Sequence, residues 1–139
     1  SQAVVVSPDF GGLKRARTLA QKLNLPLANI DKTRDLKTGE VSAVALHGEV
    51  NDKLVIIFDD VIVSGSTVIE SADCVKKAGA KQTIFASSHA LLTNGVAEIN
   101  QSLIDQVLIT NSIEHEQLNS KFQILDVAQV FANSLQNWL

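Results

Sequence analysis

The part of the sequence best suited to chemistry is an apolar run that ends in two acidic residues. Residues 54–58 are entirely apolar, Asp59 and Asp60 follow them, and a short hydroxyl-rich segment comes next, with Ser64, Gly65, Ser66 and Thr67. Ligands of open α/β sheets bind at the carboxyl ends of the strands. Backbone N–H groups at a helix start bind phosphate, and ionised carboxylates accept hydrogen bonds from vicinal hydroxyls. The spacing therefore predicts a sugar-phosphate site.

A structural alternative stays open for this segment, in which the acids and serines only cap a helix that follows a strand. Other phosphate-binding patterns are absent from the sequence, which contains neither G-x-x-x-x-G-K-[ST] nor G-x-G-x-x-G. A P-loop and a Rossmann dinucleotide site are therefore not indicated.

A second segment, Ser7-Pro8-Asp9-Phe10-Gly11-Gly12, combines an acid with two glycines. Glycine lets the backbone approach a ligand oxygen closely, and a carboxylate is a hard oxygen ligand for magnesium. The alternative is a strand-to-helix turn in which Asp9 is a cap.

The elements that must position these residues alternate along the chain, in the pattern of βα units and a mostly parallel sheet. Strands are predicted at residues 3–6, 27–30, 54–58, 83–87, 106–109 and 122–125. Helices, each with one buried face, are predicted at 13–23, 67–78 and 127–135. Gly79 stands where a left-handed helix cap is expected. The predicted fold class is α/β, as a single domain over residues 1–139.

Residues 31–40 differ from these elements because they contain several charged residues and hardly any apolar one. We predict an exposed, mobile loop there. Cys74, the single cysteine, has no partner for an internal disulfide and no metal-ligand spacing around it, so we predict a core position.

Composition narrows the classes of partner. The chain has a net charge of −3 and no cluster of lysine or arginine, which argues against nucleic acid. It has no run of 18 apolar residues and no signal-peptide pattern, so we expect neither a membrane span nor secretion, and a cytoplasmic location. A strand pattern begins almost directly after Ser1, from which we expect a fragment of a longer protein.

Several segments together resemble a known family. Residues 59–67 are similar to the phosphoribosyl pyrophosphate motif of type I phosphoribosyltransferase folds, and the chain from Val4 to about Ile113 resembles the C-terminal half of ribose-phosphate pyrophosphokinases. Further matches in family order are residues 5–12, Asp31-Lys32-Thr33-Arg34, Ala78-Gly79-Ala80, Ser88-His89 and residues 109–113. The resemblance implies a type I phosphoribosyltransferase fold, a mostly parallel sheet with helices on both faces, and an N-terminal half that is absent from this chain.

The resemblance also implies a reaction, the transfer of pyrophosphate from Mg-ATP to ribose 5-phosphate, which forms 5-phosphoribosyl 1-diphosphate. The implied substrate-binding residues are Asp59, Asp60, Ser64, Gly65, Ser66 and Thr67. Asp9 would hold Mg²⁺, and Lys32 and Arg34 would close over the ATP phosphates as catalytic cations. We expect the domain alone to be inactive, and the full-length enzyme to be a homo-oligomer, namely a hexamer.

Two alternatives remain. One is a phosphoribosyltransferase proper, which uses the diphosphate sugar, although Lys32, Arg34 and the Asp9 segment favour the kinase. The other is a non-catalytic regulatory paralogue, because Val63 replaces a family aspartate and Ser66 a family glycine. His89 matches a family histidine without a role that we derive, and we expect His47 and His115 to be surface or structural residues.

Overall fold

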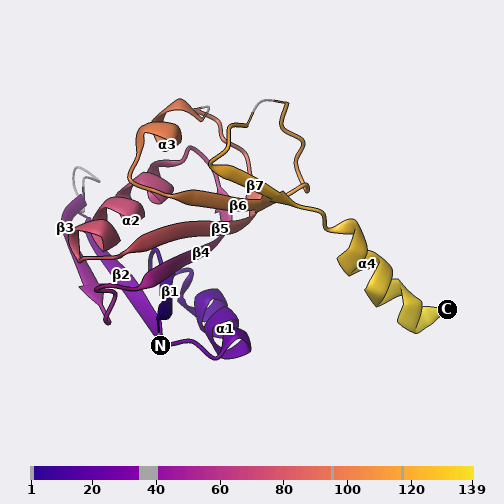
Figure 1. The fold of residues 1–139 in the computed structure, drawn as a ribbon, viewed down its shortest axis with the longest axis horizontal. Coiled ribbons are helices and arrows are strands. Elements are labelled where there is room, and N and C mark those ends of the chain that lie inside the picture. The colour runs from indigo at the N-terminus through magenta and orange to yellow at the C-terminus, as the bar shows by residue number, and fades with distance from the viewer. Residues whose placement is uncertain (1, 35–40, 95, 117) are drawn as a thin grey trace.

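The fold is that of a computed structural model, which describes residues 2–34, 41–94, 96–116 and 118–139. Within these residues, seven strands form one sheet in the order β3-β2-β1-β4-β5-β6-β7 (Figure 1). Neighbouring strands are parallel, except that β2 and β3 are antiparallel. The elements in chain order are β1 (Ala3–Ser7), α1 (Leu13–Leu23), β2 (Leu27–Arg34), β3 (Val41–His47), β4 (Leu54–Ile62), α2 (Ser66–Lys77), β5 (Gln82–Ala90), α3 (Ala97–Gln101), β6 (Gln106–Thr110), β7 (Phe122–Leu125), α4 (Ala128–Leu135) and the 3₁₀ helix η1 (Gln136–Trp138).

The main core lies between the sheet and α2. Val55 and Ile57 of β4 and Phe85 of β5 are fully buried, and Val68 and Val75 of α2 belong to the same cluster. Burying each such side chain stabilises the fold by about 1.5–3 kcal/mol. A strand as apolar as β4 is typical of a parallel sheet covered on both faces.

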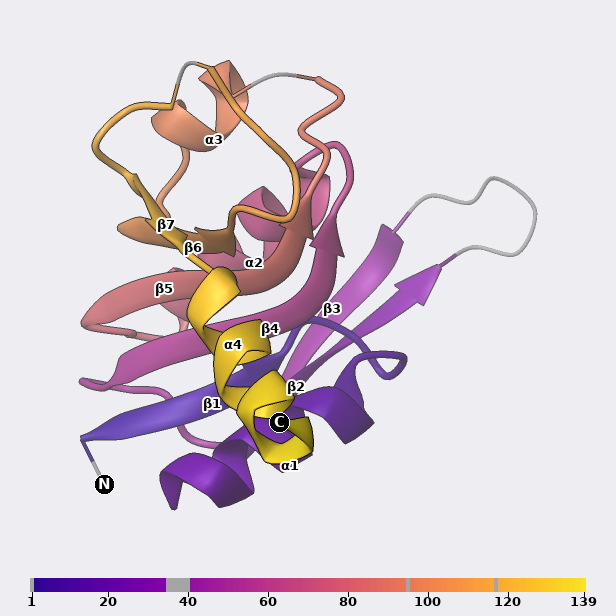
Figure 2. The ribbon, with the colours of Figure 1, turned by 90° about the vertical axis from the view of Figure 1, so that its right-hand side faces the viewer.

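The opposite face of the sheet is covered by α1. Val5 points to this face, because successive strand residues alternate between faces, and it forms a second buried cluster with Ala16 and Ala20 of α1. The two views place α1 and α2 on opposite sides of the sheet (Figures 1 and 2). The predicted α/β class, with a mostly parallel sheet and helices on both faces, is confirmed.

The predicted loop at residues 31–40 is wrong at its start. Asp31 and Lys32 belong to β2, which continues to Arg34 and pairs with a strand that the sequence did not predict, β3. Residues 35–40 lie outside the described part of the chain. A two-stranded edge ribbon tolerates polar residues because its stability comes from backbone pairing as well as from side-chain burial, and this weakens the local apolar signal.

The predicted buried face of the last helix is also wrong. No residue of α4 is buried, and Figure 1 shows the helix extending away from the sheet. The periodicity of apolar residues locates a helix, but it does not say whether a partner covers its apolar side. Among the described helices, none is long and apolar enough to cross a membrane.

The prediction of a left-handed residue after α2 is confirmed, because Gly79 has a φ of +88°.

We expect Gly79→Ala to lower the free energy of unfolding by about 1–2 kcal/mol or more, because the left-handed conformation disfavours a Cβ, and because that Cβ would clash with the Asn51 side chain. Urea unfolding measures the change. Asn24→Gly is the matched control, since Asn24 caps α1 with φ of +52° and glycine there relieves strain. Equal stability of Gly79→Ala and the unmodified chain would contradict the argument.

Candidate functional site

The site is built at the end of β4, which lies in the middle of the sheet between β1 and β5. The strand was predicted to end at Phe58, but it continues to Ile62, so both acids lie within it. The residue Asp59 is only 9% exposed, whereas the side chain of Asp60 is 50% exposed. The two carboxylates therefore differ in environment although they are adjacent in sequence.

Arg15 joins the two carboxylates. Its Nη2 lies 3.1 Å from Oδ1 of Asp59 and 3.2 Å from Oδ1 of Asp60. Arg15 lies in the first turn of α1, and this helix places it at the carboxyl end of β4, although the two elements are far apart in the sequence. Sequence reasoning missed it. Its signal is a run of basic residues at the start of a helix, where the helix dipole disfavours positive charge unless an acid lies nearby.

The pKa of Asp59 is raised above its usual value of 3.8, because burial disfavours the charged form. The Asp60 backbone N–H, which donates to Oδ1 of Asp59 at 2.9 Å, and the Arg15 side chain act in the opposite direction. Ionising Asp59 in the folded state therefore costs free energy, and its two hydrogen-bond donors offset only part of that cost.

The phosphate-sized part of the site lies between β4 and α2. A small cavity of about 100 Å³ is lined by residues 61–68 and Phe85. The helix begins after Gly65, whose φ is +97° and where an added Cβ would lie 2.8 Å from Cδ1 of Ile99. The first intrahelical bond is donated by Ile69 N–H to the Gly65 carbonyl, so the preceding N–H groups at the positive end of α2 have no intrahelical acceptor.

The hydroxyls of this segment are close together. Ser64 Oγ and Ser66 Oγ are 3.2 Å apart, and Ser66 N–H points to Ser64 Oγ at 3.4 Å. Thr67 is half-buried in the same cavity lining. Helix starts at which N–H and hydroxyl donors converge are the usual place where proteins bind anions.

The predicted magnesium residue, Asp9, lies on the loop after β1. Its Oδ1 accepts a hydrogen bond from Gly12 N–H at 2.8 Å, and Ser7 Oγ donates to its carbonyl at 2.7 Å. The turn-capping alternative is therefore present in the structure. A carboxylate has about four acceptor positions, and the bond from Gly12 N–H uses one of those of Asp9. The other acceptor positions of this exposed side chain remain available.

The predicted catalytic lysine, Lys32, is paired with an acid. Its Nζ lies 2.8 Å from Oε2 of Glu70, and its side chain is only 8% exposed. Glu70 stands one turn beyond Ser66 on α2, so the ion pair ties β2 to the helix that begins in the hydroxyl-rich segment, residues 64–67. The side chain of Arg34, the second predicted cation, lies outside the described part of the structure.

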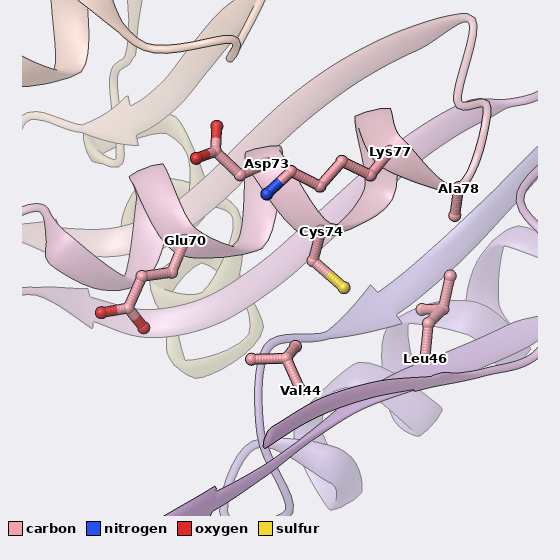
Figure 3. Close-up of a pocket in the computed structure, with 7 residues that line it drawn as sticks. All are labelled: Val44, Leu46, Glu70, Asp73, Cys74, Lys77 and Ala78. Atoms are coloured by element: carbon pink, nitrogen blue, oxygen red, sulfur yellow. The ribbon is translucent and has the colours of Figure 1, made fainter. Parts of the chain in front are cut away.

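Beside this ion pair, a cleft of about 560 Å³ opens between β3 and α2. Figure 3 shows the sulfur of Cys74 directed toward Val44 and Leu46 of β3, with Glu70 and Lys77 along the same helix. Cys74 was predicted to lie in the core. It packs against the main core but is only half-buried, because one side of it lines the cleft. Burial raises the pKa of its thiol, which keeps it protonated and a poor nucleophile.

The histidines have separate surroundings. His89 is exposed at the end of β5, where its Nδ1 lies 2.8 Å from Ser112 Oγ. His115 Nε2 lies 2.9 Å from the Ala90 carbonyl, and His47 is exposed on β3. The structural or surface roles predicted for His47 and His115 agree with these positions.

Comparison with known proteins identifies the family. A family model described as a phosphoribosyl transferase domain matches residues 1–122.

The chain belongs to the phosphoribosyl transferase domain family.

Curated relatives narrow the resemblance. The chain is 39% identical over 135 residues to the ribose-phosphate pyrophosphokinase of Thermotoga maritima, and 39% identical over 137 residues to ribose-phosphate pyrophosphokinase 2 of Schizosaccharomyces pombe. Each match covers 96% of this chain and 42% of the relative. The chain thus spans less than half the length of these relatives. The predicted resemblance to ribose-phosphate pyrophosphokinases is confirmed.

Solved structures agree with this assignment. The phosphoribosylpyrophosphate synthetase of Mycobacterium smegmatis superposes with a TM-score of 0.84 and 29% identity, over 99% of this chain and 45% of that one. A purine phosphoribosyltransferase from Pyrococcus horikoshii has a TM-score of 0.53 and 23% identity, which supports the fold alone.

In this phosphoribosyl transferase domain, the fold brings part of the predicted site together. An added Cβ at Gly12 would lie 3.6 Å from carboxylate oxygens of both Asp9 and Asp59, so the loop after β1 and the end of β4 are adjacent. The segment of residues 64–67 follows directly from β4. Lys32 is instead held on the side of α2 by Glu70.

The residues present fit the magnesium ion that the resemblance implies. Gly11 and Gly12 form a cradle without side chains, since a Cβ at Gly12 would lie 3.0 Å from Ser7 Oγ. Among the described residues, no group of three or more acids, histidines or cysteines is placed to hold a metal. Magnesium usually takes only one or two carboxylates and completes its shell with water and substrate phosphates, and the exposed carboxylate of Asp9 has the chemistry of such a ligand.

We expect Asp59→Asn to raise the free energy of unfolding at neutral pH. A carboxyl with a raised pKa in the folded state binds its proton more tightly when folded, so the folded state loses stability as pH rises through that pKa. The amide removes this loss and keeps an oxygen acceptor for Arg15. Below the usual value of 3.8 the advantage should disappear, because both states are protonated.

Urea unfolding of both proteins at neutral and acid pH measures this difference. Asp60→Asn is the matched control, because its carboxylate contacts the same arginine but is half exposed, and no gain is expected there. A lower stability of Asp59→Asn than of the unmodified chain at neutral pH would contradict this prediction. It would show that the ion pair with Arg15 stabilises the folded state by more than the burial of the Asp59 charge destabilises it.

Proposed function

We propose that this domain binds ribose 5-phosphate and presents it to Mg-ATP, as the C-terminal half of a ribose-phosphate pyrophosphokinase. The observation that supports this most is the juxtaposition of Asp59 and Asp60, bridged by Arg15, with the donor-rich start of α2. One part offers acceptors for sugar hydroxyls and the other offers donors for a phosphate. A sugar phosphate is the small ligand that needs both.

Each part of the site has a separate task in this proposal. Asp60, the more exposed acid, accepts hydrogen bonds from the ribose hydroxyls, while Arg15 holds both carboxylates in place. The N–H groups at the start of α2 and the hydroxyls of Ser64, Ser66 and Thr67 bind the 5′-phosphate. The sugar is thereby oriented with its 1-hydroxyl toward the loop that contains Asp9.

The proposed reaction is attack of the ribose 1-hydroxyl on the β-phosphorus of ATP. An oxygen–phosphorus bond forms at the sugar, the bond between the α,β-bridging oxygen and the β-phosphorus breaks, and AMP leaves. Magnesium, when bound, supplies a Lewis acid to the phosphate oxygens. The contribution of the protein is to position the reactants and to stabilise the charge of the transition state.

Lys32 is the cation proposed to act on that charge. To reach the ATP phosphates, Lys32 has to leave Glu70, whose Oε2 lies 2.8 Å from its Nζ. Arg34 follows two residues later and is proposed for the same task. The adenine site and the rest of the ATP site are proposed to belong to the N-terminal half, in a full-length enzyme that assembles as a homo-oligomer.

We expect ribose 5-phosphate to bind to the chain itself, with amide NMR shifts in and around residues 59–67. Thr67→Val should weaken binding by about 10-fold or more, because a hydrogen bond to a charged group contributes about 1.5–3 kcal/mol. Ribose without phosphate should not distinguish the variant from the unmodified chain. Thr18→Val on α1 is the matched control, since its hydroxyl bonds only within its helix.

Shifts confined to other segments would overturn the site. Normal binding without turnover in the full-length enzyme would instead identify the non-catalytic alternative.

In the full-length enzyme we expect Lys32→Ala to lower kcat by at least ~10²-fold and to leave the affinity for ribose 5-phosphate nearly unchanged, as for a group that acts mainly on transition-state charge. Steady-state kinetics with Mg-ATP measure both parameters. Lys53→Ala is the matched control, because Lys53 Nζ donates to the Glu49 carbonyl away from the site. Activity of Lys32→Ala within a few-fold of the unmodified enzyme would contradict the role of Lys32.

A further inference from the structure

The ion pair between Lys32 and Glu70 encloses a charge that the proposed function needs elsewhere. The side chain of Lys32 is 8% exposed, whereas that of Glu70 is 43% exposed. Among the ion pairs of the described residues, Lys32 is the least exposed cation. A buried ammonium without a counter-ion is costly, because removing one partner of a buried pair leaves an uncompensated charge. Glu70 therefore balances a charge that the fold has largely withdrawn from water.

The meeting of these two residues follows from the register of β2 and the position of α2. Ile30, two residues before Lys32 on the same strand, is fully buried in the main core with residues of α2. Successive strand residues alternate between the faces of a sheet, so Lys32 projects from the same face as Ile30. Glu70 reaches the lysine from α2, one turn beyond Ser66. The pair is thus made by two regular elements.

The carboxylate of Glu70 offers Lys32 the same kind of acceptor as a phosphate. A lysine ammonium has three donors and no acceptor, and both carboxylates and phosphates bind it through anionic oxygens. The hydrogen bond from Lys32 Nζ to Glu70 Oε2 is 2.8 Å long, which is typical of a charge-assisted bond. Substrate phosphates and Glu70 would therefore compete for one ammonium group.

The surroundings of the pair leave room for a change of partner. Val44, which lies opposite Lys32 in the register of β2 and β3, lines the cleft of about 560 Å³ together with Cys74 and Glu70 itself (Figure 3). The pairing of β2 with β3 also shifts its register between Thr33 and Arg34, directly after Lys32, and such a bulge locally disrupts the ladder. The edge of the sheet is therefore less closely packed on α2 than the core under β4.

We propose that Glu70 is a positioning residue, which holds Lys32 at the side of α2 until substrate phosphates replace its carboxylate. The inference rests on the proposed function, in which Lys32 acts on the charge of the transition state. It adds that the ammonium is withheld in the absence of phosphate. A polyphosphate has to displace an anion before it gains this cation, so Glu70 lowers the activity that a free Lys32 would give.

The size of the effect follows from the competition. An interaction is weakened by the fraction of molecules in which the required group is free, and removing Glu70 raises that fraction for Lys32. Because Glu70 is itself nearly half exposed, the pair has a modest strength, and we expect a gain of about 3- to 10-fold.

Steady-state kinetics of the full-length enzyme test the proposal. We expect Glu70→Ala to raise kcat/KM for Mg-ATP by about 3- to 10-fold and to leave the KM for ribose 5-phosphate unchanged. Glu70→Gln should give a smaller rise, because a neutral acceptor binds an ammonium less strongly than a carboxylate does. Asp73→Ala is the matched control, since it removes the same charge from the same helix and cleft, and no change is expected there.

The double variant shows whether Glu70 acts through the lysine. Glu70→Ala should give no gain when Lys32→Ala is already present, and a gain that persists there would overturn the proposal. An unchanged or lower kcat/KM of Glu70→Ala, in a protein that circular dichroism shows to be folded, would also overturn it, because a purely structural pair predicts that result. An equal gain in Asp73→Ala would reduce the effect to net charge and would overturn it too. Glu70→Gln decides if Glu70→Ala does not fold.

Failure of this inference is distinct from failure of the proposed function. A large loss of kcat in Lys32→Ala without a gain in Glu70→Ala contradicts only the holding role of Glu70. Normal kcat in Lys32→Ala, or no turnover in the unmodified enzyme, contradicts the proposed role of Lys32, and the inference about Glu70 falls with it.

Discussion

The site is organised around one charge, the carboxylate of Asp59, which is held at the end of a buried parallel strand. β4 is enclosed by β1 and β5, and the chain surrounding Asp59 leaves its side chain only 12% exposed. Arg15 and the Asp60 N–H donate to the same oxygen and favour the charged form of Asp59, against the effect of burial. Helix α1 is therefore more than a cover for the sheet, since it also delivers the cation that joins the two acids.

Close backbone approach around this charge depends on residues without side chains. A Cβ at Gly12 would lie 3.0 Å from Ser7 Oγ and 3.6 Å from Oδ1 of Asp59, and a Cβ at Gly65, before α2, would lie 2.8 Å from Cδ1 of Ile99. Burial of Asp59 at the end of β4 raises the pKa of its carboxyl.

The two faces of the sheet are covered unequally. The face under α2 is a closed core, and α2 has the hydroxyl-rich residues 64–67 at its start and Glu70, the partner of Lys32, one turn later. The face under α1 is closed only over part of its width, so an apolar groove remains beside β5, β6 and β7.

The sequence by itself determined the α/β class, the bounds of α1, the six predicted strands and the left-handed turn at Gly79, because β-branched runs, apolar periodicity and glycine act over a few residues. It also indicated residues 7–12, after β1, and residues 59–67, at the end of β4, as candidate site segments. Only the tertiary structure decided that Asp31 and Lys32 pair with β3, that Arg15 joins two acids 44 and 45 residues away, and that Lys32 meets Glu70.

These contacts depend on the order of strands in the sheet, which no local pattern encodes. For the same reason the apolar stripe of α4 predicted a helix correctly but not its exposure, since coverage is a property of the neighbouring surface.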